Sequence, residues 1–447
     1  MEMRIALSIA GSDSGGGAGI QADIKTFAAL GVYPCTVITA ITAQNTSNVT
    51  HILPVHPDSV RKQIESVISD MPVHAIKVGM VYNKQILSAV SKLLKKSNIP
   101  VILDPILAAG TGKSLLIKKY LEKFKSELIP LAYVITPNVH EAEELSGVPI
   151  KSESDIIRCA ELIKGLGAKN VIVKGGHTKA KNHVVDTLID NEGKINKISN
   201  PRININQTHG SGCNFSAAIA AFVARNYTLL RSFIMANEYV QESMSKLIYL
   251  GKGIPINLPL FSLYDDASKF RTVLALESSV EQLSEVVGFR DLIPETQTNF
   301  VYALPFARNR DEVAALDGRI VRLSKGVKVS GMVKFGSSKH VASAVIEYMK
   351  YDPLIRSAIN IRFSKKLIDR LRSLYTVAEY RRSEEPFIIK HVEGKTVSWG
   401  VSKALSENPG AEIIYHKGDF GKEAMILIFG PNPSDVVNKI KQIVKVY

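Results

Sequence analysis

The feature that most constrains this chain is a regular alternation of short apolar runs with amphipathic segments over residues 1–260. The predicted strands are 4–10, 35–40, 75–78, 100–103, 132–136 and 170–174. The predicted helices between them include 18–30, 58–69, 84–96 and 154–166. Such alternation predicts an α/β fold, with a parallel sheet covered by helices on both faces.

The predicted strands share a second property, because they end in polar or Gly-rich residues. These tips are 11–13, 77–80, Asp104-Pro105, 136–138 and 174–176. In open α/β sheets, ligands bind at the carboxyl ends of the strands. We therefore expect the tips to converge on one binding site.

The pattern changes after residues 251–260, where Gly and Pro are too frequent for the interior of an element. We predict a first domain at 1–250, a linker at 251–264 and a smaller α+β domain at 265–447. In the second domain we expect helices near 266–287, 340–350 and 434–445. We expect strands near 319–323, 326–333 and 355–362.

Charge and cysteine content narrow the possible binding partners and the cellular compartment. Lys and Arg outnumber Asp and Glu by 56 to 42, and the excess is spread over both parts. This balance suits small anionic substrates about as well as nucleic acid. Three cysteines without paired spacing predict a reducing cytoplasm and argue against a disulfide scaffold or a zinc site. No apolar stretch approaches the ~18 residues of a membrane span.

The Gly210-Ser211-Gly212-Cys213 loop opens an apolar helix that runs to about residue 224. Small residues let the backbone approach a phosphate, and helix N-terminal N–H groups point at it. Such a loop can hold the phosphoryl group transferred from ATP. The alternative is a tight turn before a core helix, with Cys213 as a small buried hydrophobe. At a helix N-terminus Cys213 could instead act as a base or within an anion hole.

Two acidic residues near strand tips are candidates for a magnesium site. Glu141 lies in the first turn of a helix that follows Asn138, and Asp104 precedes Pro105. Mg²⁺ prefers carboxylates and keeps several waters, so both residues could hold it through water. The alternative is that each is an ordinary cap residue.

Taken in order, these motifs resemble hydroxymethylpyrimidine/phosphomethylpyrimidine kinases of the ribokinase superfamily. The matching segments are 8–23 (SIAGSDSGGGAGIQAD), 42–46, 77–80, Asp104-Pro105, 136–138 with Glu141, 174–177 and 208–216. The resemblance covers about residues 3–250. It implies a ribokinase-like three-layer α/β/α fold with a mostly parallel sheet.

The resemblance implies two successive ATP-dependent phosphorylations. The first acts on the hydroxymethyl group of 4-amino-5-hydroxymethyl-2-methylpyrimidine, and the second converts the monophosphate to the diphosphate. By family analogy, Asp23 and Gln44 read the aminopyrimidine ring and Met80 packs nearby.

The same analogy places the phosphate chemistry on the other motifs. Mg²⁺ and the phosphates would be bound in the region of Asp104, Asn138 and Glu141. Lys174 would neutralise the charge of the ATP phosphates, and residues 210–213 would form the anion hole. The chain departs from the family pattern at two positions, because Ser211 and Asn214 stand where Thr is usual.

The second part resembles the archaeal-type thiamine-phosphate synthase domain over about 265–447. The segments that carry this resemblance are 317–321, 333–340, 360–362, 381–386, 399–400 and 418–423. It implies condensation of the pyrimidine diphosphate with hydroxyethylthiazole phosphate, giving thiamine phosphate and diphosphate. We expect Arg319 and His340 to be charged groups at that site. The alternative is that they are solvated charges beside a turn and a helix cap.

Two alternative functions stay open. Similar domains occur as thiamine-phosphate sensors, so the second part could bind without catalysis. A nucleic-acid-binding regulator is motivated only by the charge, and we find no helix-turn-helix and no basic stripe with aromatic residues. We expect a bifunctional cytoplasmic enzyme without nucleic-acid or membrane partners. We also expect a homo-oligomer, a dimer through the kinase domain.

Overall fold

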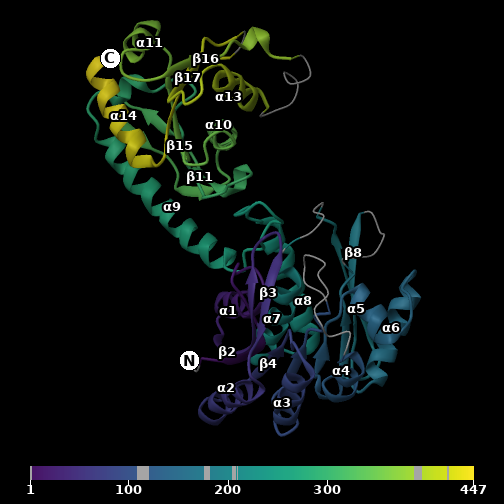
Figure 1. Ribbon diagram of the computed structural model, residues 1–447. Coiled ribbons are helices and arrows are strands. Elements are labelled where there is room, and N and C mark those ends of the chain that lie inside the picture. Colours follow the sequence, from purple (N-terminus) through teal and green to yellow (C-terminus); the bar gives the residue numbers. More distant parts are fainter. Residues whose placement is uncertain are drawn as a thin grey trace. The chain divides into compact units, whose positions relative to one another are not determined.

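The computed structural model describes residues 3–107, 120–175, 182–203, 208, 210–386, 395–419 and 422–447. The chain divides into two compact units, Met1–Leu263 and Tyr264–Tyr447 (Figure 1). Three positions of the kinase-like motifs, Gly176, His177 and His209, lie outside the described residues.

The first unit is built on a nine-stranded sheet with the strand order β3-β2-β1-β4-β5-β6-β7-β8-β9. The strands are β1 Ile5–Asp13, β2 Tyr33–Gln44, β3 Val49–Pro54, β4 Ala75–Val78, β5 Val101–Leu103, β6 Val134–Ile135, β7 Asn170–Val173, β8 His183–Ile189 and β9 Ile195–Pro201. The central strands β2, β1, β4, β5, β6 and β7 are parallel, β3 and β8 run antiparallel to them, and β9 pairs antiparallel with β8. The predicted mostly parallel sheet is confirmed.

The strands β3, β8 and β9 do not appear among the predicted ones, and the exposure of the two edge strands explains why β3 and β9 are missing. Most residues of β3 and β9 are exposed or half-buried, because these strands lie at the edges of the sheet. An edge strand need not carry a continuous apolar run, since only part of it is covered.

Helices cover both faces of this sheet in two apolar layers. One layer contains α2 Pro57–Asp70, α3 Lys84–Leu94, α4 Leu121–Glu127, α5 Val139–Ser146 and α6 Glu153–Gly165. The other contains α1 Gly19–Ala29, α7 Ser211–Ala224 and α8 Leu229–Ser245. Helix α7 is buried on almost every side, because its small residues allow close packing between the sheet and α8. The three-layer α/β/α architecture is therefore confirmed.

The Gly- and Pro-rich segment 251–260 packs on the first unit. Gly253 donates its N–H to Thr46 Oγ1 at 3.1 Å, and Ile248 pairs with Ile256. Just after it, the Phe261 ring lies 5.9 Å from that of Tyr239.

The second unit contains a seven-stranded mixed sheet with the order β14-β11-β10-β15-β18-β17-β16. Its strands are β10 Phe300–Ala303, β11 Val313–Leu316, β14 Val333–Phe335, β15 Ser357–Arg362, β16 Val377–Glu379, β17 Ile413–His416 and β18 Met425–Gly430. A separate hairpin is formed by β12 Ile320–Arg322 and β13 Val327–Val329. The predicted strand at 326–333 ends early, because Gly331 adopts a φ of 83° and β14 starts after it.

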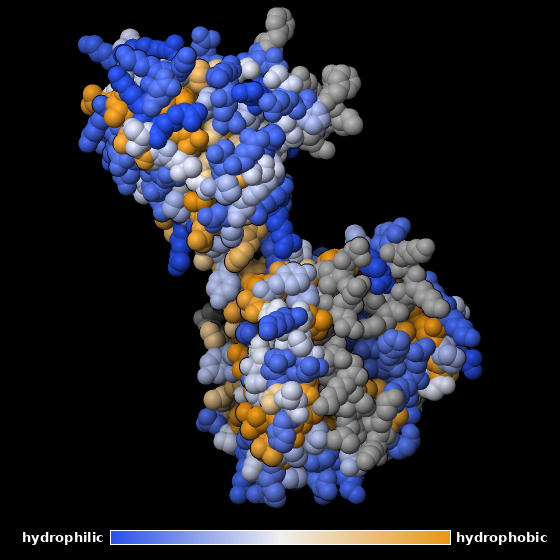
Figure 2. All heavy atoms as spheres, turned by 45° about the horizontal axis from the view of Figure 1, so that its top comes forward, coloured by the Kyte–Doolittle hydropathy of each residue, from blue (hydrophilic) through white to orange (hydrophobic). Residues whose placement is uncertain are grey.

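Helices pack on both faces of this second sheet. One face carries α9 Phe261–Ser284, α11 Lys365–Leu371 and α14 Pro433–Val446, and the other carries α10 His340–Met349 and α13 Lys395–Glu407. This is the expected α+β unit. The visible faces of both units mix hydrophilic and hydrophobic residues (Figure 2). Within the described ranges, no helix combines the length and apolar character needed to cross a bilayer.

Candidate active site

A Gly-rich turn follows β1 in the first unit and is held by one carboxylate. Asp13 Oδ1 accepts the N–H of Gly15 at 2.8 Å, and Oδ2 accepts those of Gly17 and Ala18 at 3.0 and 2.8 Å. Helix α1 then begins at Gly19, where a Cβ would lie 2.2 Å from the carbonyl oxygen of Gly11. The turn can therefore bring α1 close to β1 only with glycine at this position.

The predicted phosphate loop meets this turn. Gly210 has a φ of 91°, and a Cβ on it would lie 1.9 Å from the carbonyl oxygen of Gly17. Ser211 begins α7 and accepts the hydroxyl of Thr208 at 3.1 Å. The N-termini of α1 and α7 are thereby adjacent, and both direct N–H groups and positive dipole ends to one place.

An ion pair lies beside the phosphate loop. Lys174 Nζ is 3.1 Å from Asp104 Oδ1, and Ser216 donates its hydroxyl to Asp104 Oδ2 at 3.0 Å. A Cβ on Gly212 would be 3.4 Å from Lys174 Nζ, so the ammonium group lies next to the loop. Residues from β5, β7 and α7 are thus joined into one charged cluster.

Glu141 and Asn138 flank this cluster through a capping box at the start of α5. Asn138 N–H donates to Glu141 Oε2 at 2.8 Å, and Glu141 N–H donates to Asn138 Oδ1 at 2.9 Å. Burial raises the pKa of Glu141 to about 7, with Lys174 lowering it and Asp104 raising it. Asp104 follows β5 and Glu141 lies in the helix after the neighbouring strand β6, so both carboxylates come from the same edge of the sheet.

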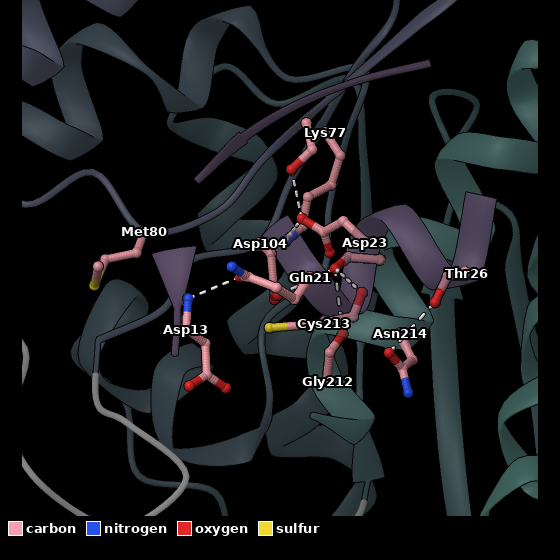
Figure 3. A network of polar contacts seen from close by, with 12 residues as sticks. Asp13, Gln21, Asp23, Thr26, Lys77, Met80, Asp104, Gly212, Cys213 and Asn214 are labelled. Atoms are coloured by element: carbon pink, nitrogen blue, oxygen red, sulfur yellow. Dashed lines mark hydrogen bonds and ion pairs between the residues drawn. The ribbon is translucent and has the colours of Figure 1, made fainter. Parts of the chain in front are cut away.

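A second buried ion pair lies behind Cys213 (Figure 3). Lys77 Nζ is 3.0 Å from Asp23 Oδ2, and both side chains are fully buried. Ser8 also donates to Asp23 Oδ2 at 2.6 Å, while Asp23 Oδ1 has no partner. A contact between Asp23 and the pyrimidine would therefore fall to Oδ1.

Cys213 is partly exposed, and its sulfur points to the side where Asp13 and Met80 lie (Figure 3). Burial raises the pKa of the Cys213 thiol to about 11, although Lys77 and the N–H of Gly19 lower it. The thiol is consequently protonated at neutral pH.

The predicted substrate-reading residues lie at the ends of neighbouring strands. Gln44 ends β2 and accepts the hydroxyl of Thr42 at 3.4 Å. Met80 follows β4, is 7% exposed, and packs against Ala40. A Cβ on Gly11 would lie 2.2 Å from Met80 Cε. Glycine in the first strand tip therefore leaves the space that the Met80 side chain occupies.

Two residues that the structure places around Cys213, Lys77 and Asp13, were not predicted as site residues. Lys77 occurs in the buried strand sequence Ala-Ile-Lys-Val, and a cation in such a strand is itself a signal of a buried partner. Asp13 belongs to the strand tip 11–13 and to the motif at 8–23, but no site role is predicted for it. Its role depends on a turn whose N–H groups fold back onto it.

In the second unit, the structure does not by itself join Arg319 and His340. Arg319 follows β11 and lies next to Ile320, which bridges to Thr298 just before β10. Gly336, four residues before His340, donates its N–H to Val313 at the opposite end of β11. Their joint role stays a prediction.

The fold and this site define the class of the first unit. It is a ribokinase-like small-molecule kinase, with the adjacent N-termini of α1 and α7 at the carboxyl ends of a mostly parallel sheet. Residues 13–257 match the family model for phosphomethylpyrimidine kinase, and residues 275–442 match that for thiamine-phosphate synthase ThiN.

Individual relatives agree with these matches. The bifunctional thiamine biosynthesis protein ThiDN of Methanocaldococcus jannaschii is 31% identical over 448 residues, covering 99% of both chains. The hydroxymethylpyrimidine/phosphomethylpyrimidine kinase of Bacillus subtilis is 42% identical over 254 residues, 57% of this chain and 93% of its own. The solved ADP complex of Bacillus subtilis pyridoxal kinase superposes with a TM-score of 0.54 and 33% identity, covering 59% of this chain and 100% of that one.

The chain belongs to the phosphomethylpyrimidine kinase family, with a ThiN thiamine-phosphate synthase domain fused behind the kinase domain. The resemblances derived from both halves of the sequence are confirmed.

Proposed function

We propose that the chain phosphorylates 4-amino-5-hydroxymethyl-2-methylpyrimidine twice with ATP and then joins the diphosphate to hydroxyethylthiazole phosphate. The kinase domain spans residues 1–250 and the synthase domain 265–447, joined by residues 251–264. The product of the first domain is the substrate of the second, which gives a chemical reason for the fusion.

The observation that carries the kinase proposal is the meeting of two helix N-termini with a half-buried cation, Lys174. Backbone N–H groups of residues 210–213 would hold the transferred phosphoryl group, and Lys174 beside Gly212 would neutralise its charge. Such electrostatic stabilisation is the main requirement of phosphoryl transfer, because charge spreads onto the peripheral oxygens.

Asp104 and Glu141 fit a Mg²⁺ ion bound through water. Within the described residues no group of three or more potential ligands is clustered. Two nearby carboxylates nevertheless suffice for an ion that keeps several waters and uses substrate phosphates as ligands. Mg²⁺ would supply charge neutralisation of the ATP phosphates, and Asn138 would hold Glu141 in place.

On the substrate side, Gln44 and Asp23 Oδ1 would read the polar edge of the pyrimidine, and Met80 would pack on the ring. In the synthase domain, Arg319 and His340 would bind the departing diphosphate. Arginine gives two parallel hydrogen bonds to phosphate oxygens, and either residue would stabilise the charge that the leaving group develops.

The experiment that tests both activities uses the purified full chain. With ATP, Mg²⁺ and the pyrimidine alcohol, we expect the monophosphate and then the diphosphate. With the pyrimidine diphosphate and thiazole phosphate but no ATP, we expect thiamine phosphate. Tight binding of thiamine phosphate without its formation would make the second domain a sensor and refute the synthase proposal.

We also propose a cytoplasmic dimer formed through the kinase domain. All three cysteines are free thiols, as a reducing compartment favours. Light scattering on the full chain measures the mass, and a monomer at micromolar concentration would contradict the dimer.

A further inference from the structure

Four polar side chains meet where β16 and β17 end in the second unit, and we name them the Tyr380 cluster. They are Tyr380, Arg382, Glu385 and His416, of which Tyr380, Glu385 and His416 are 2, 6 and 5% exposed. The rings of Tyr380 and His416 are 5.1 Å apart. Arg382 and Glu385 lie in the turn that follows Tyr380, where the N–H of Glu385 donates to the carbonyl oxygen of Arg382 at 3.2 Å. Burial raises the pKa of Tyr380, while Arg382 lowers it and Glu385 raises it.

The Tyr380 cluster contains three buried polar atoms without a hydrogen-bond partner. They are the hydroxyl of Tyr380, Nε of Arg382 and Oε1 of Glu385. Leaving such an atom unpaired in the interior is unfavourable, and more so when the group is charged. Buried polar groups in native proteins are usually paired, so three orphans in one place indicate a missing partner.

The fold places these atoms together through strand register and one glycine. Strands β16 and β17 are parallel, with Glu379 opposite Tyr415, and Tyr380 continues the pairing by donating its N–H to Tyr415 at 3.1 Å. A Cβ on Gly400 of α13 would lie 2.3 Å from the Tyr380 ring. Glycine at this position therefore lets the Tyr380 ring lie directly against α13. Helix α13 itself lies beside β16 and β17 (Figure 1).

The aromatic surroundings favour a flat ligand. The Trp399 ring lies edge-on to that of Tyr380, with 6.3 Å between centroids. His416 Nδ1 accepts the N–H of Gly418 at 3.1 Å, which leaves the proton on Nε2. Burial, aided by Arg382, lowers the pKa of His416 to about 4, so the imidazole is neutral at neutral pH.

The unpaired atoms define the chemistry of the missing partner. Tyr380 and Arg382 offer donors, and Glu385 offers an acceptor, so the ligand must present acceptors next to a donor. An aminopyrimidine does so, because a ring nitrogen adjoins the exocyclic amino group. A thiazole phosphate has no comparable donor, and a diphosphate would meet the negative charge of Glu385.

We propose that the Tyr380 cluster binds the aminopyrimidine ring of the synthase substrate and of its product, thiamine phosphate. This inference rests on the proposed synthase function. It assigns Glu385 to the amino group and the donors of Tyr380 and Arg382 to the ring nitrogen.

Trp399 is the only tryptophan of the chain, so its fluorescence reports on this cluster. We expect the full chain to show a saturable fluorescence change with thiamine phosphate and with the pyrimidine diphosphate. Hydroxyethylthiazole phosphate alone should give none. A change with the thiazole phosphate and none with the pyrimidine compounds would overturn the assignment.

Glu385→Gln tests the assignment by kinetics, because glutamine keeps the shape and loses the charge. We expect KM for the pyrimidine diphosphate to rise about tenfold or more, since hydrogen bonds to charged groups are the stronger ones. KM for the thiazole phosphate and the kinase activity of the same chain should not change. The matched control is Glu384→Gln, whose side chain is 47% exposed and 3.8 Å from Arg381. It should behave as the unmodified chain does.

A second variant, Tyr380→Phe, removes one donor without changing the ring. Lower thermal stability with unchanged KM values in both variants would show a purely structural network and overturn the proposal. A chain that makes no thiamine phosphate would refute the synthase function instead. In that case, loss of the pyrimidine-dependent fluorescence change in Glu385→Gln would still support the binding site, and its persistence would overturn it.

Discussion

Replacing Cys213 by alanine separates the two roles that its position suggests. Alanine keeps the backbone N–H at the start of α7, so an anion hole made of backbone groups survives. The substitution removes only the sulfur, which could accept the proton of the substrate hydroxyl. With its pKa raised to about 11, the thiol supplies a thiolate fraction of about 10⁻⁴ at pH 7.

The two phosphorylations differ in their need for that thiolate. In the first, a hydroxyl must lose its proton, and a positioned base contributes roughly 10²–10⁴-fold. In the second, the attacking phosphate has a pKa of about 6 and is already largely ionised. We therefore expect Cys213→Ala to lower the first rate by about 10²-fold or more and the second by only a few-fold.

ADP release, measured separately with the pyrimidine alcohol and with its monophosphate, distinguishes the two steps. Because the active form is deprotonated, the first rate of the unmodified chain should rise with pH toward the thiol pKa, and this rise should vanish in the variant. Equal losses in both steps would show that the sulfur acts by packing. Unchanged rates in both would refute any role of the side chain.

Three further changes test other parts of the structure. Gly210→Ala places a Cβ 1.9 Å from a backbone oxygen at a positive φ, so kinase activity should be lost while thiamine phosphate synthesis persists; equal loss of both activities would contradict this. The pKa of Glu141 rises from its ordinary value of 4.5 to about 7 on folding, so the folded protein loses stability as the pH rises from about 4.5 to 7. Glu141→Gln should therefore raise the Tm at pH 8 while slowing the kinase, and an unchanged Tm would argue against the buried charge. Arg319→Ala and His340→Ala should impair synthesis and leave ATP turnover intact, and normal synthesis in both would remove them from the site.

The sequence by itself determined the central elements of the first unit and the Gly-rich loop that opens α7. The run at 75–78 coincides with β4, and 84–96 contains all of α3, because local periodicity reflects burial on one or both faces. Glycines at 210 and 212 predicted a close backbone approach at this loop, and a Cβ on Gly210 would indeed lie 1.9 Å from the carbonyl oxygen of Gly17. The edge strands β3 and β9 carried no comparable apolar pattern, because most of their residues are exposed or half-buried.

Only the tertiary structure decided which charges meet. Lys77 and Asp23 are 54 residues apart, and Lys174 and Asp104 are 70 apart, yet the first pair shares a buried contact and the second a partly buried one. Parallel register brings their strands and helices together, and no local pattern encodes that register. The same holds for the Tyr380 cluster. There, Glu379 of β16 accepts a hydrogen bond from Tyr415 of β17, which lies 36 residues later in the chain. Burial then fixes the partners, because an unpaired polar group in a protein interior is costly and must find a complement in space.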